Sequence, residues 1–127
     1  MNRLSIALAA AGLALLVALL VARPAGAQDL LVGQVAALTN PGTTANAKGL
    51  QAGLQVYFKY VNERGGVGGR QVKLITKDDE LAPGKMLAIT KEYIANKNIL
   101  ALAGYVNTGG ITEVSKSDIA GPKVMFQ

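Results

Sequence analysis

Short apolar segments recur along residues 30–127, separated by longer segments with helical spacing. The segments from Leu30 to Ala37 and from Ile99 to Ala103 are nearly continuous in apolar residues, as expected of strands covered on both faces of a sheet. The segment from Gln71 to Lys77 alternates apolar and polar residues, and a further apolar segment begins at Val124. The pattern therefore predicts four strands.

Three segments with the spacing of an amphipathic helix lie between these strands. Asn46 is a suitable N-cap for the first helix, which we expect to begin near Ala47. The second begins at Pro83, a residue favoured in the first turn, and runs to about Asn96; the third runs from Ile111 to about Ser117. Two sets of residues are expected to face the sheet: Leu50, Leu54, Tyr57, Phe58 and Val61 on the first helix, and Met86, Ile89 and Tyr93 on the second.

Strands and helices alternate without a hairpin turn between strands, which predicts a parallel, doubly wound α/β sheet. The glycine-rich segment Gly65–Gly69 is expected to end the first helix, because glycine readily takes the left-handed conformation. A nucleotide-binding glycine motif follows a strand and precedes a helix, and the order here is the reverse. The chain stops inside its fourth strand, so we expect an incomplete domain.

Residues 1–27 have the pattern of a secretory signal peptide. A short basic start precedes an apolar run from Leu4 to Ala22, and Ala25 and Ala27 fit the A-x-A pattern of a signal-peptidase site. We predict cleavage after Ala27 and a periplasmic product that spans residues 28–127. The alternative is an uncleaved membrane anchor, since an apolar run of this length could cross a bilayer.

The composition argues against catalysis and against nucleic-acid binding. The chain has no Cys and no His, so it lacks thiols, disulfides, the commonest acid/base side chain and the commonest transition-metal ligand. Without Cys no lipid anchor can be attached at the mature N-terminus, so we expect a soluble product. Arg3 and Arg23 lie in the signal segment, which reduces the formal charge from +5 to +3 beyond it. We expect no enzyme activity, no cofactor and no nucleic-acid partner.

Two loops that follow predicted strands are rich in small and hydroxyl residues: Thr39–Thr44 after the first strand and Asn107–Gly110 after the third. Ligands of open parallel sheets bind beyond the carboxyl ends of the strands, where helix N-termini offer free N–H groups. Both loops would therefore suit a carboxylate. The alternative is that these residues are ordinary turn and cap residues, which their types fit equally well.

The acidic segment Asp78–Glu80 follows the second predicted strand. Paired carboxylates at such a position can hold Mg²⁺, but no Asp follows the third strand to complete the site. The favoured interpretation is that the acidic residues cap the helix that begins at Pro83 and otherwise lie on the surface.

Several motifs in the chain resemble those of one known family. The segment Tyr60–Arg70 is similar to the pattern I-N-x-x-G-G-(I/V)-x-G-(R/K), and Asp78–Pro83 is similar to D-D-x-x-D-P. Gly104–Thr108 is similar to a G-x-x-(S/T) loop, and Ala120–Val124 to the approach to a fourth strand. Together these motifs resemble Leu/Ile/Val-type periplasmic binding proteins, and the resemblance extends over residues 30–127.

The resemblance implies a type I periplasmic binding protein of the venus-flytrap kind, with residues 28–127 as an incomplete N-terminal lobe. Such proteins deliver a small solute, here an amino acid or a related carboxylate or amide, to the permease subunits of an ABC importer in the inner membrane. In the family, a Ser/Thr hydroxyl and backbone amides after the third strand bind the solute carboxylate, and Thr108 is the best match. The candidate ligand-binding residues are Thr39, Asn46, Tyr105, Thr108, Gly109, Gly110 and Ile111.

Two alternatives to transport remain at this point. The same fold could act as a ligand-sensing module of a signalling or regulatory system, or the chain could be a gene fragment without independent function. A single lobe cannot close over a solute, so we expect its affinity to be no better than about millimolar, or about −4 kcal/mol.

Overall fold

The computed structural model describes residues 28–117, 119 and 125–126 of the 127-residue chain. In this part of the chain, four parallel strands form one sheet in the order β2-β1-β3-β4. The strands are β1 (Leu30–Ala36), β2 (Val72–Asp78), β3 (Ile99–Ala103) and β4 (Met125–Phe126), and the helices are α2 (Thr44–Glu63), α3 (Pro83–Ala95) and α4 (Thr108–Lys116). The prediction of a parallel α/β sheet is confirmed. Val124 and the signal segment 1–27 lie outside the described residues.

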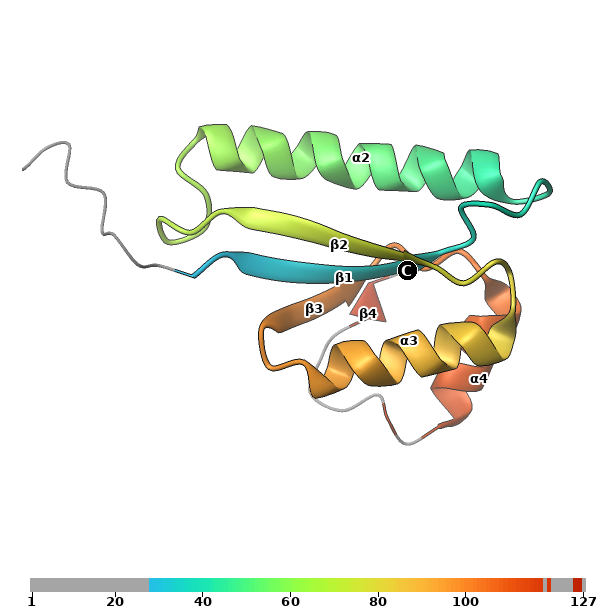
Figure 1. Cartoon of the computed structure of the whole chain (residues 1–127). Helices are drawn as coiled ribbons and strands as arrows, with labels where there is room; N and C mark the ends of the chain where they lie inside the picture. The colour runs from blue at the N-terminus through green and yellow to red at the C-terminus, as the bar shows by residue number, and fades with distance from the viewer. Residues whose placement is uncertain (1–27, 118, 120–124, 127) are drawn as a thin grey trace, which may run out of the picture.

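The strand order places helices on both faces of the sheet. The connection from β1 to β2 leads to the sheet edge through α2, whereas the connection from β2 to β3 returns past β1 through α3. In Figure 1, α2 lies above the sheet, and α3 and α4 lie below it. The direction in which successive strands are added to the sheet therefore reverses, and the connections from β1 and to β3 lie on opposite faces. The space beyond the carboxyl ends of these two neighbouring strands is a topological switch point.

The main apolar core lies between the sheet and the pair α3 and α4. Met86, Ile89 and Tyr93 of α3 are buried there, which confirms the face predicted for this helix. The packing is close, because a Cβ atom at Gly33 of β1 would lie 2.7 Å from the ring of Tyr93. A residue larger than glycine at this point of β1 would force the side chains of Tyr93 and Leu102 to shift.

Helix α2 begins earlier than the sequence pattern predicts. Its N-cap is Thr43, and the N–H groups of Thr43 and Thr44 both donate to the carbonyl oxygen of Asn40, so the loop turn continues directly into the helix. Asn46 is an exposed residue within the first turn of α2. The prediction that Asn46 caps this helix is therefore wrong.

The face of α2 that packs on the sheet is narrower than predicted. Leu54, Phe58 and Val61 are partly buried, but Leu50 is 40% exposed and Tyr57 is 62% exposed. Only Ala47 of this helix is fully buried. The prediction for Leu50 and Tyr57 fails because helical spacing identifies an apolar stripe but not the width of the surface that covers it.

The outer side of α2 carries further apolar residues around a shallow groove, which is lined by Ala52, Gly53, Val56, Tyr57 and Tyr60. The rings of Tyr57 and Tyr60 stack with their centroids 6.4 Å apart. The guanidinium carbon of Arg64 lies 3.5 Å from the centroid of the Tyr60 ring, an arrangement that favours a cation–π interaction. Helix α2 is therefore apolar on its outer side as well as toward the sheet.

The C-terminus of α2 is tied to the start of β2 through one amide side chain. Asn62 Nδ2 donates to the Val72 carbonyl oxygen over 2.8 Å, and the Val72 N–H donates to Asn62 Oδ1 over 2.7 Å. Gly65 and Gly66 follow with φ values of 98° and 74°, which confirms that glycines in the left-handed region end this helix.

Candidate functional site

The loops that follow β1, β2 and β3 meet beyond the carboxyl ends of these strands. Two consecutive side chains at the end of β2 link the loops: Asp78, the last residue of the strand, binds the β1 loop, and Asp79 binds the β3 loop. Deeper between β1 and β3, the buried side chain of Gln34 donates from Nε2 to the Gly104 carbonyl oxygen over 3.1 Å. The switch point inferred from the strand order thus contains polar side chains that link the three loops, with Gln34 joining β1 to the residue after β3.

Asp78 organises the loop after β1. Its Oδ1 accepts the Leu38 N–H over 2.9 Å, and its Oδ2 accepts the Thr39 hydroxyl over 2.6 Å. Burial acts to raise the pKa of Asp78, but the hydrogen bonds from Thr39, Glu80 and Leu38 and the charge of Lys85 outweigh it and hold the pKa below its ordinary value. The one hydrogen bond that the Thr39 hydroxyl can donate is therefore made to Asp78, within the protein.

Asp79 lies in a tight turn between β2 and α3. The Ala82 N–H donates to the Asp79 carbonyl oxygen over 2.8 Å, and the two residues between them, Glu80 and Leu81, have φ values of 54° and 67°. Positive φ values at non-glycine residues are uncommon and cost about 1–2 kcal/mol each. The Leu81 N–H donates to Asp79 Oδ1 over 3.1 Å, which helps to hold this turn.

The acidic segment does not cap α3 as predicted. The N-cap of α3 is Ala82, in an extended conformation and without a side-chain cap, and Pro83 occupies the first turn. Asp78 and Asp79 instead bind the loops on either side of them. The prediction is wrong because capping requires a position adjacent to the first turn, and the turn at Glu80 and Leu81 moves both aspartates away from it.

Helix α4 begins three residues earlier than predicted, at Thr108 rather than Ile111. Asn107 is its N-cap, with Oδ1 accepting the Gly110 N–H over 3.0 Å and the carbonyl oxygen accepting the Ile111 N–H over 2.8 Å. Asn107 is only 3% exposed. Thr108, Gly109 and Gly110 thus form the first turn of the helix rather than a loop before it.

The first turn of α4 leaves two N–H groups available. Within the described part of the chain, the N–H groups of Thr108 and Gly109 donate to no acceptor, and both residues are exposed. The N–H groups of Gly110 and Ile111 are bound by Asn107. Free N–H groups at the start of a helix carry the positive end of its dipole and attract anions.

The structure distributes the predicted ligand-binding residues over four places. Thr108 and Gly109 lie together at the exposed start of α4, with Gly110 buried and Ile111 partly buried behind them. Thr39 is exposed in the neighbouring loop, and Asn46 is exposed on α2.

Tyr105, another of these residues, is only 6% exposed and belongs to the core. Its hydroxyl lies 3.0 Å from Thr90 Oγ1. Burial raises the pKa of Tyr105 to about 12, although the hydrogen bond with Thr90 acts to lower it. Tyr93 nearby has its pKa raised by burial and by the charges of Tyr105 and Glu92. The ligand-binding role of all seven predicted residues stays a prediction.

Two residues that organise this site were not among the candidates, namely Asp79 and Asn107. Both are buried polar residues, and Asn107 Nδ2 donates to Asp79 Oδ2 over 2.8 Å. An Asn directly before Thr-Gly-Gly is a capping signal that could have been recognised in the sequence. The partnership with Asp79, which is 28 residues away, has no sequence signal.

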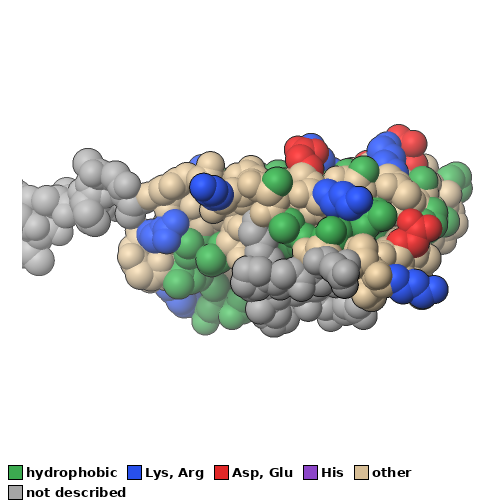
Figure 2. All heavy atoms as spheres, turned by 90° about the horizontal axis from the view of Figure 1, so that it is seen from below, with side chains coloured by type: hydrophobic (Ala, Val, Ile, Leu, Met, Phe, Trp, Pro, Cys, Tyr) green, Lys and Arg blue, Asp and Glu red, His purple; other side chains and the backbone are tan. Residues whose placement is uncertain are grey.

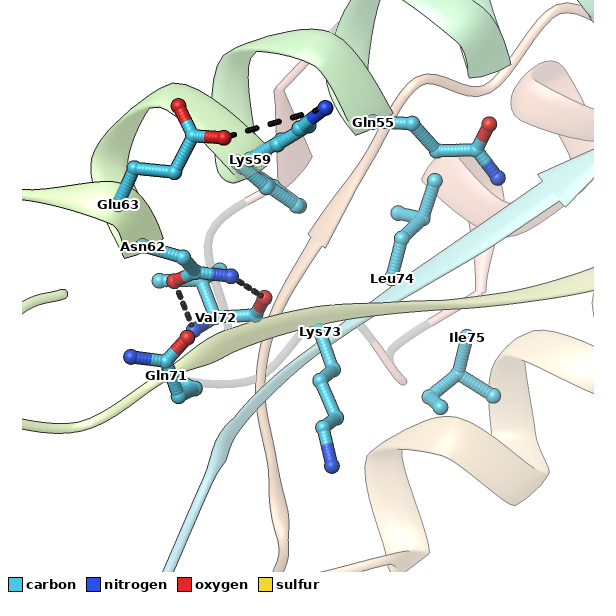
Figure 3. Close-up of a pocket in the computed structure, with 10 residues that line it drawn as sticks. Gln55, Lys59, Asn62, Glu63, Gln71, Val72, Lys73, Leu74 and Ile75 are labelled. Carbon is cyan, nitrogen blue, oxygen red and sulfur yellow. Dashed lines mark hydrogen bonds and ion pairs between the residues drawn. The ribbon is translucent and has the colours of Figure 1, made fainter.

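A pocket of about 480 Å³ lies elsewhere on the molecule. Figure 3 shows it between α2 and the open edge of β2, with Asn62 reaching from the helix to Val72 and Leu74 pointing toward α2. Lys73 and Ile75 point to the other side of the strand. Because this pocket lies along α2 and β2 and includes none of the loop residues named above, we do not assign the solute to it.

On the face of the molecule that Figure 2 shows, charge of one sign does not gather in a patch. Figure 2 shows Lys and Arg side chains standing apart from one another, with Asp and Glu among them, on the side of α3 and α4. No group of three or more carboxylates in the described residues is placed to hold a metal ion. Each helix in the same residues is too short or too polar to be a membrane span.

Comparison with known proteins extends these observations. A family model described as "Periplasmic binding protein" matches residues 30–120. The fatty acid ABC transporter substrate-binding protein from Thermomonospora curvata is 27% identical, with a TM-score of 0.62 over 69% of this chain and 22% of that one. Among functionally curated proteins, no sequence matches significantly.

Two further solved structures share the fold at 24% identity. The extracellular ligand-binding receptor from Verminephrobacter eiseniae ef01-2 has a TM-score of 0.70 over 76% of this chain and 27% of that one. The ABC transporter substrate-binding protein from Desulfitobacterium hafniense, solved in complex with Leu, has a TM-score of 0.60 over 78% of this chain and 28% of that one. The chain thus spans about a quarter of the length of the solved structures that it resembles.

Proposed function

The chain belongs to the periplasmic binding protein family, and on this premise we propose that it is part of the solute-binding receptor of an ABC importer. The solute class that we propose is an amino acid or another small molecule with a carboxylate. Relatives described as substrate-binding proteins of ABC transporters, one for fatty acids and one solved with Leu, support this class. Both kinds of compound carry a carboxylate.

The observation that carries the proposal is the start of α4 at the switch point. Thr108 and Gly109 are exposed, and their N–H groups have no acceptor within the described residues. The Thr108 hydroxyl would add a third donor. Three donors at the positive end of a helix dipole would bind a carboxylate in the way that such ends bind anions generally.

The partner and the location follow from the same proposal. The receptor would present its solute to permease subunits in the inner membrane, and residues 1–27 would direct the chain to the periplasm. Expression of the full chain in a bacterium, followed by mass spectrometry of the periplasmic fraction, should give a product that begins at Gln28. A membrane-bound product that retains residues 1–27 would favour the anchor alternative.

Solute binding is tested by NMR titration of the full chain, because chemical shifts detect millimolar binding. L-Leucine and sodium decanoate should both shift the amide signals of Thr108 and Gly109. Leucinamide, which lacks the carboxylate, should shift them much less. Equal responses to leucine and leucinamide, or shifts confined to other residues, would contradict the proposal.

A pair of variants on α4 separates the site from the rest of the helix. Thr108→Val removes one donor and should weaken L-leucine binding about tenfold, the usual scale for a hydrogen bond to a charged group. Ser115→Ala removes an exposed hydroxyl at the other end of α4 and should leave binding unchanged. Equal effects of the two substitutions would exclude the start of α4 as the site.

A further inference from the structure

We propose that Asp79 is a positioning residue that sets the start of α4 for solute binding by fixing the orientation of the Asn107 side chain. This inference rests on the proposed function for its effect on the solute. It rests on the contacts of two buried side chains for its mechanism. Asp79 is 0% exposed and Asn107 is 3% exposed.

The amide of Asn107 can satisfy its contacts in only one orientation. Gly110 N–H is a donor, so the atom of Asn107 that faces it must be Oδ1, at 3.0 Å. Nδ2 then faces Asp79 Oδ2, at 2.8 Å. A carboxylate accepts but does not donate, so Asp79 enforces the orientation that caps α4.

Asp79 is itself held in place by its own turn. Its Oδ1 accepts the Leu81 N–H over 3.1 Å, and its carbonyl oxygen accepts the Ala82 N–H over 2.8 Å. Both carboxylate oxygens are therefore used, one by the β2 loop and one by Asn107. Asp79 therefore acts on α4 through one side chain, that of Asn107.

The cap decides which amides remain free for a solute. Asn107 binds the N–H groups of Gly110 and Ile111 and leaves those of Thr108 and Gly109 exposed. Without the cap the first turn of α4 would fray, and the two free N–H groups would no longer be held parallel. Asp79 would thus act on affinity without touching the solute.

The variant Asp79→Asn tests this directly because it keeps the size of the side chain. The substituted side chain can offer its one oxygen to Leu81, and its NH₂ group then faces the NH₂ group of Asn107. Two donors cannot bind each other, so Asn107 must give up either this contact or its cap on Gly110. We expect hydrogen exchange of the Gly110 amide to accelerate about tenfold, because the loss of an N-cap has an effect of this size. The shift of the Thr108 signal on addition of L-leucine should become weaker at the same time.

The double variant Asp79→Asn/Asn107→Asp provides the rescue. The new NH₂ group at position 79 would donate to one oxygen of the new carboxylate at position 107, whose other oxygen would again accept the Gly110 N–H. We expect Gly110 exchange to return to within about threefold of the wild-type rate, because the cap on this amide is restored. Asp78→Asn is the matched control, because Asp78 binds Leu38, Thr39 and Glu80 and should leave Gly110 exchange unchanged.

The outcomes separate this inference from the proposed function. Unchanged Gly110 exchange in Asp79→Asn, a double variant that is not rescued, or tighter leucine binding in Asp79→Asn would overturn the positioning role. If neither L-leucine nor decanoate shifts the Thr108 and Gly109 signals of the wild-type protein, that result would instead overturn the proposed function. In that case the exchange data would still decide whether Asp79 orients Asn107. Circular dichroism spectra of every variant confirm that it is folded.

Discussion

Gly110 occupies a point where two helices approach each other closely. A Cβ atom there would lie 2.5 Å from Met86 Sδ and 2.8 Å from Met86 Cβ on α3. Gly53, in the middle of α2, has no atom of another element within 4 Å of the position that a Cβ would take. A side chain at position 110 would therefore clash with α3. At position 53 there is room for a side chain, and glycine only lowers the helix propensity.

We predict that Gly110→Ala lowers the free energy of unfolding by about 1–2 kcal/mol. The gain in helix propensity, about 1 kcal/mol, is smaller than the cost of overpacking against Met86. Gly53→Ala should raise the free energy of unfolding by up to about 1 kcal/mol, since nothing opposes the gain. Urea denaturation measures both, and a stabilised Gly110→Ala protein would contradict the close packing of α3 and α4.

The buried tyrosines make stability depend on pH in the alkaline range. Burial raises the pKa of Tyr105 to about 12, so the folded protein keeps a proton that the unfolded chain releases above about pH 10. The stabilisation from this group is complete below pH 10 and is lost as pH rises toward 12. Tyr93, whose pKa is also raised, acts in the same direction.

We predict that Tyr105→Phe reduces the loss of stability between pH 9 and pH 11. Between the pKa of the unfolded chain and that of the folded protein, one such tyrosine lowers the free energy of unfolding by about 1.4 kcal/mol for each pH unit. Tyr57→Phe, which removes a hydroxyl from an exposed ring, is the matched control. The measurement is urea denaturation at several pH values, and identical slopes for Tyr105→Phe and wild type would refute the prediction.

At the scale of elements, the junction of α2 and β2 depends on Asn62. Its amide binds both backbone groups of Val72, on the side of β2 away from β1. This contact places the C-terminus of α2 against the start of an edge strand. The apolar packing of α2 on the sheet is partial, because Ala47 is its only fully buried residue.

We predict that Asn62→Ala lowers the free energy of unfolding by about 1–2 kcal/mol, because two partly buried backbone groups lose their partner. Gln55→Ala, at an exposed position of the same helix, should change it by less than about 0.5 kcal/mol. Thermal and urea denaturation compare the two. Equal effects would mean that helix propensity, rather than the contact with Val72, determines the result.

The predicted elements succeeded and failed for identifiable reasons. The strands and α3 were predicted close to their observed bounds because their apolar patterns are local. Strand β1 and α3 are buried as expected, whereas Leu100 of β3, predicted to be covered, is 61% exposed. The start of α4 was misplaced because Thr108, Gly109 and Gly110 are poor helix formers, and this low propensity outweighed the capping signal of Asn107. The outward Tyr57 was misassigned because a helical stripe does not show what covers it.

At the scale of the whole molecule, the two faces of the sheet are packed unequally. Helix α3 buries Met86, Ile89, Thr90 and Tyr93, and α4 packs beside it. Helix α2 covers the opposite face alone among the described helices, and its outer side exposes Val56 and Tyr57 at 69% and 62%. Local stability should follow the buried contacts.

We predict that amide hydrogen exchange in α2 is at least about tenfold faster than in α3, a difference of about 1.4 kcal/mol in opening free energy. The amides of β1, which has neighbours on both sides, should exchange most slowly. Mass-spectrometric exchange on the full chain resolves these segments. Comparable protection of α2 and α3 would show that the outer side of α2 is covered in solution.

The sequence by itself determined the strands, the approximate helices and the parallel α/β class, because apolar periodicity and glycine positions are local properties of the chain. It also placed a candidate carboxylate site after the first and third strands. Only the tertiary structure decided which donors are free there. Thr39 donates to Asp78, 39 residues away, and Asn107 is oriented by Asp79, 28 residues away. Hydrogen-bond partners so distant in the chain meet only when the sheet has formed, so no local pattern could reveal them.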